Sequence, residues 1–171
     1  MRILGIDPGL ADTGWGIIEV KKNRSYHIGH GTISTKAALP AGERLSIIFS
    51  GIREIMQLYS PEIAGIESLY FAKNRQTAIP VAQARGVLLL ACSIEKIRHF
   101  EYTPLQIKQA ITGNGRAEKA QVQEMVRLLL GLDEIPRPDH AADALGAAIC
   151  CYHTQVTAAM TSRRANLKRD K

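Results

Sequence analysis

Two acidic residues at the ends of short apolar segments are the first candidates for chemistry in this sequence. Asp7 follows the apolar residues 3–6, and Pro8 then interrupts the segment because proline cannot donate to a strand ladder. Glu67 ends a second apolar segment, residues 62–67. The carboxyl ends of strands are where α/β sheets gather their ligands. If the two strands are neighbours, the two carboxylates lie side by side and require a cation or a shared proton.

A third group of polar residues lies on a helix that we expect to begin near residue 138. His140 and Asp143 are three residues apart, and Asp139 and Asp143 are four apart, so either pair shares one helix face. Helix capping accounts for Asp139 but not for Asp143, which stands in an alanine-rich segment. The candidate catalytic and metal-binding site is therefore Asp7, Glu67, His140 and Asp143, with Asp139 adjacent.

These side chains favour a hard divalent cation. Oxygen donors without cysteine select Mg²⁺ or Mn²⁺ over zinc. Two such ions in a carboxylate cluster suit phosphodiester hydrolysis, because one activates the attacking water and the other stabilises the departing 3′ oxygen. Taken singly, Asp7 could only cap a turn, and Glu67 could be a solvated strand end.

Two segments predict contact with nucleic acid. Residues 68–76 place Tyr70 beside Lys73 and Arg75, a mixture that suits base stacking and phosphate contact. The alternative is a loop that leads into a helix and has partly buried aromatic residues.

The second segment is a glycine turn between two helices, and it is bracketed by Lys108, Arg116 and Lys119. Backbone N–H groups and positive charge at such a turn can hold a phosphate backbone. Solvated lysines are the commoner explanation for such residues.

The spacing of apolar residues predicts the elements that position these groups. Three consecutive strands within residues 1–35 predict an antiparallel meander. Further elements are expected as a helix over 40–60, a strand over 62–67, a helix over 77–98, a strand over 99–102, two helices within 103–131, the second opening at Ala117, and a last helix from about 138.

Composition limits the class of protein. A chain of 171 residues with 46% hydrophobic content suits a single folded domain. It has neither an apolar run of about 20 residues for a membrane span nor a signal-peptide pattern. Three cysteines without zinc-ligand spacing predict buried thiols in a reducing cytoplasm. The net charge of +6 includes +4 from residues 161–171, so a polyanion would be held by a local basic patch.

Five segments together resemble the RuvC family of Holliday-junction resolvases over nearly the whole chain. They are ILGIDPGLADTGWG (3–16), AGIESLYFAKN (64–74), VAQARG (81–86), QIKQAITGNGRAEKAQVQEMV (106–126) and DHAADAL (139–145). The resemblance implies an α/β, ribonuclease-H-like fold, with a mixed five-stranded sheet flanked by helices. It also implies Mg²⁺-dependent paired nicking of four-way DNA junctions by a homodimer that acts with a branch-migration helicase complex.

The resemblance also assigns residues. The family's acidic cluster falls on Asp7, Glu67, His140 and Asp143, and His140 belongs to a variant form, which leaves open whether it binds metal or acts as a base. Tyr70 matches a base-contacting aromatic position. Lys108 and Lys119 match residues that hold phosphates. On this basis residues 1–158 are expected to form one nuclease domain, and residues 159–171 a basic tail whose order the sequence leaves open.

Two rival functions fit parts of the sequence. An actin-like ATPase also opens with a strand, an Asp, a glycine turn and a returning strand, but this chain is too short for two such domains. A junction-binding protein that has lost its metal site would keep the fold, and the intact acids disfavour it.

Overall fold

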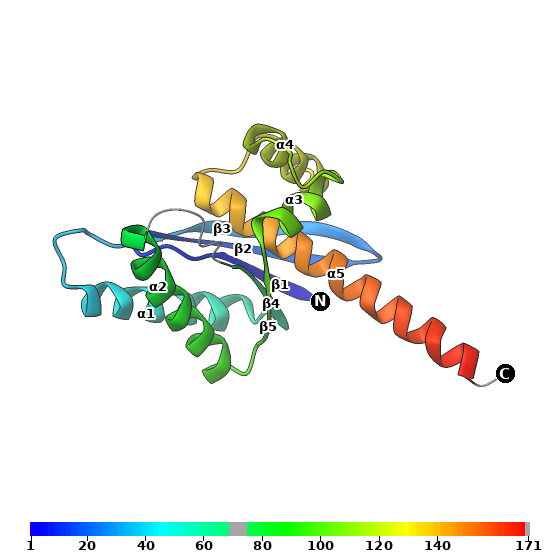
Figure 1. The fold of residues 1–171 in the computed structure, drawn as a ribbon, viewed down its shortest axis with the longest axis horizontal. Coiled ribbons are helices and arrows are strands. Elements are labelled where there is room, and N and C mark those ends of the chain that lie inside the picture. Colours follow the sequence, from blue (N-terminus) through cyan, green and yellow to red (C-terminus); the bar gives the residue numbers. More distant parts are fainter. Residues whose placement is uncertain (69–74, 170–171) are drawn as a thin grey trace.

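The chain folds into a five-stranded sheet with helices on both faces (Figure 1). The computed structural model describes residues 1–68 and 75–169, and the side chains of 1–68 and 78–157. The strands are β1 (Arg2–Asp7), β2 (Asp12–Lys21), β3 (Arg24–Ser34), β4 (Ile63–Glu67) and β5 (Arg98–Tyr102). The helices are α1 (Ala41–Tyr59), α2 (Arg75–Ile94), α3 (Pro104–Thr112), α4 (Lys119–Leu130) and α5 (Asp139–Arg169).

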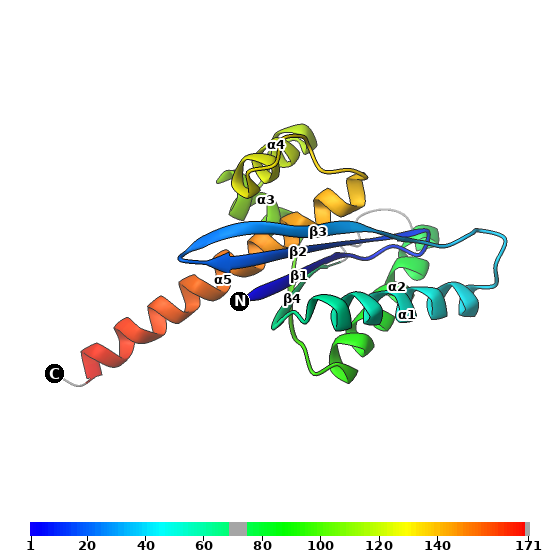
Figure 2. The same ribbon diagram turned by 180° about the vertical axis from the view of Figure 1, so that it is seen from behind.

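The sheet has the strand order β3-β2-β1-β4-β5, and Figure 2 shows β3, β2, β1 and β4 in this order. β1, β2 and β3 pair antiparallel, whereas β4 pairs parallel with both β1 and β5. The predicted mixed sheet with an antiparallel meander is therefore confirmed. The parallel pairing of β1 with β4 puts the two strands side by side, with their acid-bearing carboxyl ends at the same end of the sheet.

The alternation of side chains along β1 builds two separate cores. Ile3 packs with α3, α4 and α5 on one face, and Leu4 and Ile6 pack with α1 and α2 on the other. A strand buried on both faces is an almost continuous apolar run, as the sequence of β1 is. The result is a three-layer α/β/α arrangement.

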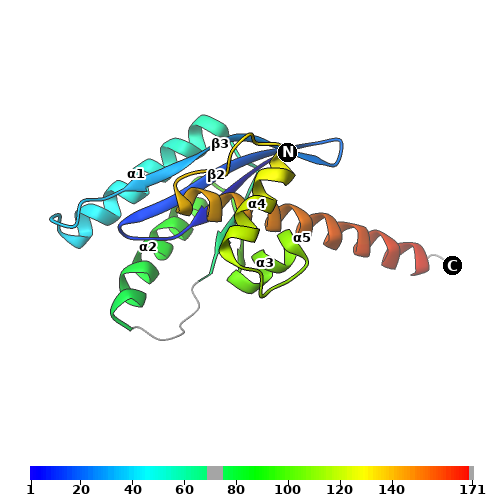
Figure 3. The same ribbon diagram turned by 90° about the horizontal axis from the view of Figure 1, so that it is seen from above.

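Helix α5 lies directly on the backbone of the sheet. A Cβ atom at Gly5 would stand 1.8 Å from the carbonyl oxygen of Ala144, and one at Gly14 would stand 1.9 Å from that of His140. Only glycine permits this approach, because no side-chain atom separates the strand from the helix. Beyond the sheet, α5 projects away from the body of the molecule and continues to Arg169 (Figure 3). The backbone of the predicted tail is therefore helical as far as this residue.

Helix α3 begins as its sequence suggests, and α4 does not. Thr103 and Gln106 form a reciprocal capping box at the start of α3. We expected α4 to open at Ala117, but the amide of Ala117 closes a turn onto the carbonyl of Asn114, and Glu118 is extended. Helix α4 therefore begins at Lys119.

The three cysteine side chains, Cys92, Cys150 and Cys151, are buried and unpaired, as predicted. Burial raises the pKa of the Cys150 and Cys151 thiols to about 11. At neutral pH these thiols are therefore protonated and weakly nucleophilic. Within the described residues, none of the helices combines the length and the apolarity needed to cross a bilayer.

The contact between α5 and Gly5 predicts a large cost for a single added methyl group. Gly5→Ala must displace α5, so we expect it to lower the free energy of unfolding by about 3 kcal/mol or more, the upper range of overpacking. Urea denaturation would measure the loss. Gly42→Ala is the control, because Gly42 is exposed in the first turn of α1 with open space around it. That variant should be neutral or more stable by about 0.5–1 kcal/mol. Equal effects of the two substitutions would contradict this account of the helix–sheet contact.

Candidate active site

Strand alternation turns Asp7 and Glu67 toward α5. On β1, Gly5 faces α5, so Asp7, two residues later, lies on the same face. On β4, Gly65 faces Ala147 of α5, so Glu67, two residues later, also lies on the face toward α5. The register pairs Ile6 with Ile66, which makes the two acids neighbours. The predicted pairing of the two carboxylates is confirmed.

His140, in the first turn of α5, contacts Asp7 directly. The imidazole Nδ1 lies 2.6 Å from Asp7 Oδ2, and the His140 side chain is half exposed. This hydrogen bond to Asp7 raises the pKa of His140, although partial burial acts in the opposite direction. A protonated His140 therefore compensates the charge of Asp7.

Asp143, one helical turn later, is compensated by a lysine of α4. Lys119 Nζ lies 3.3 Å from Asp143 Oδ2 and 3.1 Å from Asp139 Oδ2. Burial raises the pKa of Asp143, and the charge of Asp7 adds to this, whereas Lys119 opposes it. Partial burial disfavours the charged form of Lys119, but its bonds to the two aspartates outweigh this and raise its pKa.

Glu67 is the acid of this cluster that the protein leaves uncompensated. Within the described residues, no hydrogen bond or ion pair engages its carboxylate. Burial, and then the negative charges of Asp7 and Asp143, raise the pKa of Glu67 to about 8. The carboxyl group is thus mostly protonated at neutral pH, and a bound cation would favour its ionised form.

A cavity of about 210 Å³ joins the acids to two of the predicted phosphate-binding lysines. Its lining includes the acids Glu67 and Asp143 and the lysines Lys108 and Lys119. Lys108 Nζ donates to the carbonyl of Ala117 at 2.7 Å, which fixes the lysine beside the turn before α4. The cavity therefore presents acids and cations to the same volume.

The other residues predicted to contact nucleic acid are not found in the lining of this cavity among the described residues. Arg116 is exposed on the turn between α3 and α4 and does not line this cavity. Tyr70 and Lys73 lie outside the described residues. Arg75 begins α2, but its side chain is also outside the described part. The predicted roles of these residues stay predictions.

The sequence did not reveal a second group of contacts around Asp139. Gln123 of α4, only 7% exposed, donates from Nε2 to Asp139 Oδ1 at 3.2 Å, and Arg137 reaches the same oxygen at 2.7 Å. The i, i+4 spacing of Lys119 and Gln123 was the available signal, because both then share a helix face. What that face meets is decided by tertiary packing.

The donor set fits a divalent cation. Three carboxylates and an imidazole are ligands for Mg²⁺ or Mn²⁺, and Glu67 is a partly buried acid that has no ion pair with any other described residue. As they stand, no three acidic, histidine or cysteine side chains of the described residues are arranged to hold a metal ion. The reason lies in the contacts above, since His140 occupies Asp7 and Lys119 occupies Asp143. A metal ion held by both aspartates would compete with these two contacts.

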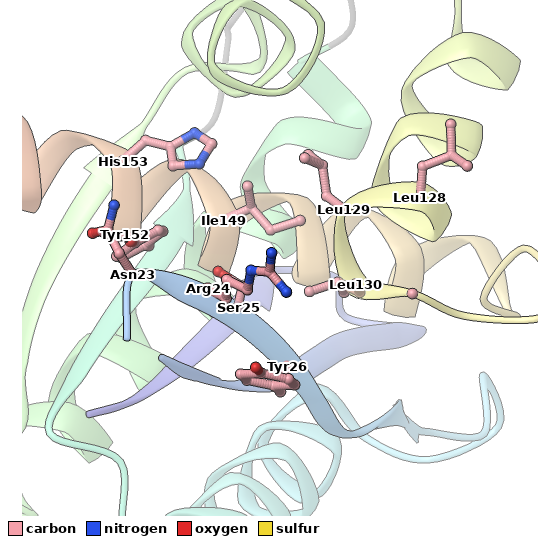
Figure 4. Close-up of a pocket in the computed structure, with 11 residues that line it drawn as sticks. Asn23, Arg24, Ser25, Tyr26, Leu128, Leu129, Leu130, Ile149, Tyr152 and His153 are labelled. Carbon is pink, nitrogen blue, oxygen red and sulfur yellow. Dashed lines mark hydrogen bonds between the residues drawn. The ribbon is translucent and has the colours of Figure 1, made fainter. Parts of the chain in front are cut away.

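A separate cleft of about 590 Å³ lies between β3, α4 and α5 (Figure 4). It is lined by Arg24 and Tyr26, by the end of α4, and by Ile149 and His153. These α5 residues are roughly 9–20 Å farther along the helix than His140 and Asp143. The cleft has no carboxylate in its lining and is not the candidate active site.

Comparison with known proteins identifies the family of this chain. The family model of crossover junction endodeoxyribonuclease RuvC matches residues 3–151. The chain belongs to the RuvC family. The RuvC protein of Treponema denticola is 57% identical over 147 residues, which are 86% of this chain and 83% of that protein. The RuvC protein of Caldanaerobacter subterraneus is 49% identical over 154 residues, 90% of this chain and 93% of that protein.

Solved structures give the same result. Thermus thermophilus RuvC superposes with a TM-score of 0.85 at 33% identity, covering 92% of this chain and 97% of that one. The same protein in complex with a Holliday junction substrate gives 0.84 at 36% identity, over 88% and 92% of the two chains. The yeast mitochondrial Holliday junction resolvase gives 0.63 at 11% identity, over 86% and 76% of the chains, and supports the fold alone. The predicted ribonuclease-H-like α/β fold is confirmed.

The raised pKa of Glu67 predicts how the metal-free protein responds to pH. Between the ordinary glutamate pKa of 4.5 and about 8, the folded state holds a proton that the unfolded state has lost. Stability then falls as pH rises through this window, by up to ~1.4 kcal/mol per pH unit, and levels off above it. Glu67→Gln removes this loss, so its advantage over wild type should grow from pH 5 to pH 8. Urea unfolding in EDTA at a series of pH values would measure it. An advantage that does not change with pH would contradict the assignment.

Proposed function

We propose that this protein resolves Holliday junctions by symmetric, divalent-metal-dependent nicking of two opposed DNA strands in recombination and repair. The observation that carries the proposal is the acidic cluster formed by β1, β4 and α5, with two lysines facing the same cavity. Its relatives are named crossover junction endodeoxyribonucleases, and Thermus thermophilus RuvC has been solved with a Holliday junction substrate. Family membership sets aside the actin-like ATPase.

The side chains divide into two roles. Asp7, Glu67 and Asp143 would hold the cations, and His140 would either join them as a ligand or act as a base once Asp7 is engaged. When bound, two Mg²⁺ ions, or Mn²⁺ in their place, supply an activated water and charge stabilisation of the leaving oxygen. Lys108 and Lys119 would fix a phosphate of the scissile strand at the mouth of the cavity.

We propose a homodimer as the working unit. A four-way junction has near two-fold symmetry, so a C₂ dimer presents one site to each of two opposed strands. Support comes from α2, which exposes Ile79, Leu90 and Ile94 at 64%, 55% and 48%. Their spacing of eleven and four residues puts them on one helix face, as an apolar contact surface requires.

The wider proposal includes the setting of the reaction. Residues 1–158 form the nuclease domain and residues 159–171 the basic tail, a division that the family match over 3–151 supports. Because the proposed substrate is bacterial recombination DNA, the protein would act in the cytoplasm. A branch-migration helicase complex is the proposed partner by family resemblance.

The direct test is cleavage of synthetic four-way junctions, both mobile and immobile, with linear duplex as the control. Paired symmetric nicks are expected on the junction in Mg²⁺ and none in EDTA. Asp7→Asn should lower the rate by roughly 100-fold or more, because even partners outside a metal's own ligands contribute about 10–100-fold. Asp133→Asn, which removes an exposed acid from the loop before α5, should cut at the wild-type rate. Binding without nicking of the mobile junction would favour the non-catalytic alternative.

The two cavity lysines predict a change in salt dependence. Lys108→Ala and Lys119→Ala should each weaken junction binding in EDTA and reduce the slope of log K against log salt by about 0.7–0.9, the value of one phosphate contact. Lys96→Ala is the control, since Lys96 is exposed at the opposite, amino-terminal edge of β5. Slopes equal to that of wild type would remove the phosphate role of these lysines.

A further inference from the structure

Lys119 is held between two carboxylates, of which we expect one, Asp143, to bind metal and the other, Asp139, not to. Its ammonium group lies within 3.3 Å of both Asp139 and Asp143. Asp143 is a candidate metal ligand, so a cation and Lys119 compete for the same carboxylate. When the cation wins, Lys119 keeps Asp139 as its remaining anchor.

Asp139 is itself held by contacts with three side chains. The amide of the buried Gln123 fixes one carboxylate oxygen from α4, and Arg137 contacts the same oxygen from the loop before α5. Lys119 takes the other oxygen. Because Gln123 and Lys119 are one turn apart on α4, the helix presents both to the same partner. A carboxylate supported in this way keeps its geometry when its neighbours change.

We infer that Asp139 is a positioning residue, which retains Lys119 at the cavity mouth after Asp143 has taken up metal. The inference rests on the proposed function, because it concerns the phosphate-facing state of Lys119. A lysine has a long, flexible side chain and would otherwise move into solvent. Asp139 touches neither the reacting atoms nor, in this account, the metal, and it acts through Lys119 alone.

Asp139→Asn should slow cleavage of the junction without weakening its binding. Asp139→Asn removes a negative charge near a polyanion, so junction affinity in EDTA should be unchanged or higher. Single-turnover cleavage in Mg²⁺ should fall by about 10–100-fold, because the phosphate-binding group is misplaced. The control Asp133→Asn removes the same charge from the neighbouring loop and should leave the cleavage rate unchanged. Cleavage by Asp139→Asn at the wild-type rate would overturn the inference.

A double-mutant cycle separates positioning from independent action. Adding Asp139→Asn to Lys119→Ala should slow cleavage no further, because the residue through which Asp139 acts is absent. The same additional loss in both backgrounds would overturn the inference. So would recovery of Asp139→Asn cleavage at high Mg²⁺ concentration, which would make Asp139 a metal ligand.

A second variant tests the inference even if Asp139→Asn fails to fold. Gln123→Met removes the amide that holds Asp139, keeps every charge and nearly keeps the volume. It should lower cleavage in the same direction, by a smaller factor, and have no effect in the Lys119→Ala background. An effect that persists in that background would overturn the inference. Wild-type protein is assayed alongside, and its failure to cut the junction would count against the proposed function itself.

Discussion

The backbone contact between helix α5 and the glycines of the sheet is the constraint on which the site depends. Gly5 and Gly14 leave no side chain between strand and helix, so α5 rests on the sheet at the shortest distance that the two backbones allow. At that distance His140 reaches Asp7, and Asp143 comes close enough to Asp7 and Glu67 for their charges to interact. With larger residues in the strands, the two halves of the acidic cluster would be separated.

Three neighbouring carboxylates repel one another, and cationic side chains of the same chain offset most of this repulsion. His140 compensates Asp7, and Lys119 compensates Asp143, while Glu67 keeps a raised pKa. The same two cationic groups would compete with a metal ion for these carboxylates. The site is therefore built so that folding without metal is tolerable, while a divalent cation remains the better partner for three neighbouring carboxylates.

Much of this could be predicted from the sequence, since it depends on local patterns. The acid-ending apolar strands predicted that Asp7 and Glu67 are neighbours, and helical spacing put His140 and Asp143 on one face. The predicted start of α4, Ala117, was wrong by two residues, because a turn after Asn114 competes with the helix there. The contacts of Lys119 could not be predicted, because 24 residues separate it from Asp143 and only packing of α4 on α5 joins them. Nor does composition show that a buried glutamine supports Asp139.

The burial of all three cysteines has a practical consequence for following this protein in solution. With thiol pKa values of about 11 at Cys150 and Cys151, and a higher one at Cys92, the native sulfurs are slow to react with maleimides or disulfide reagents at neutral pH. A single cysteine introduced on an exposed position would then carry a fluorophore or spin label almost alone. In the proposed dimer, distances between the two protomers could thus be measured without first replacing native residues that fill the core.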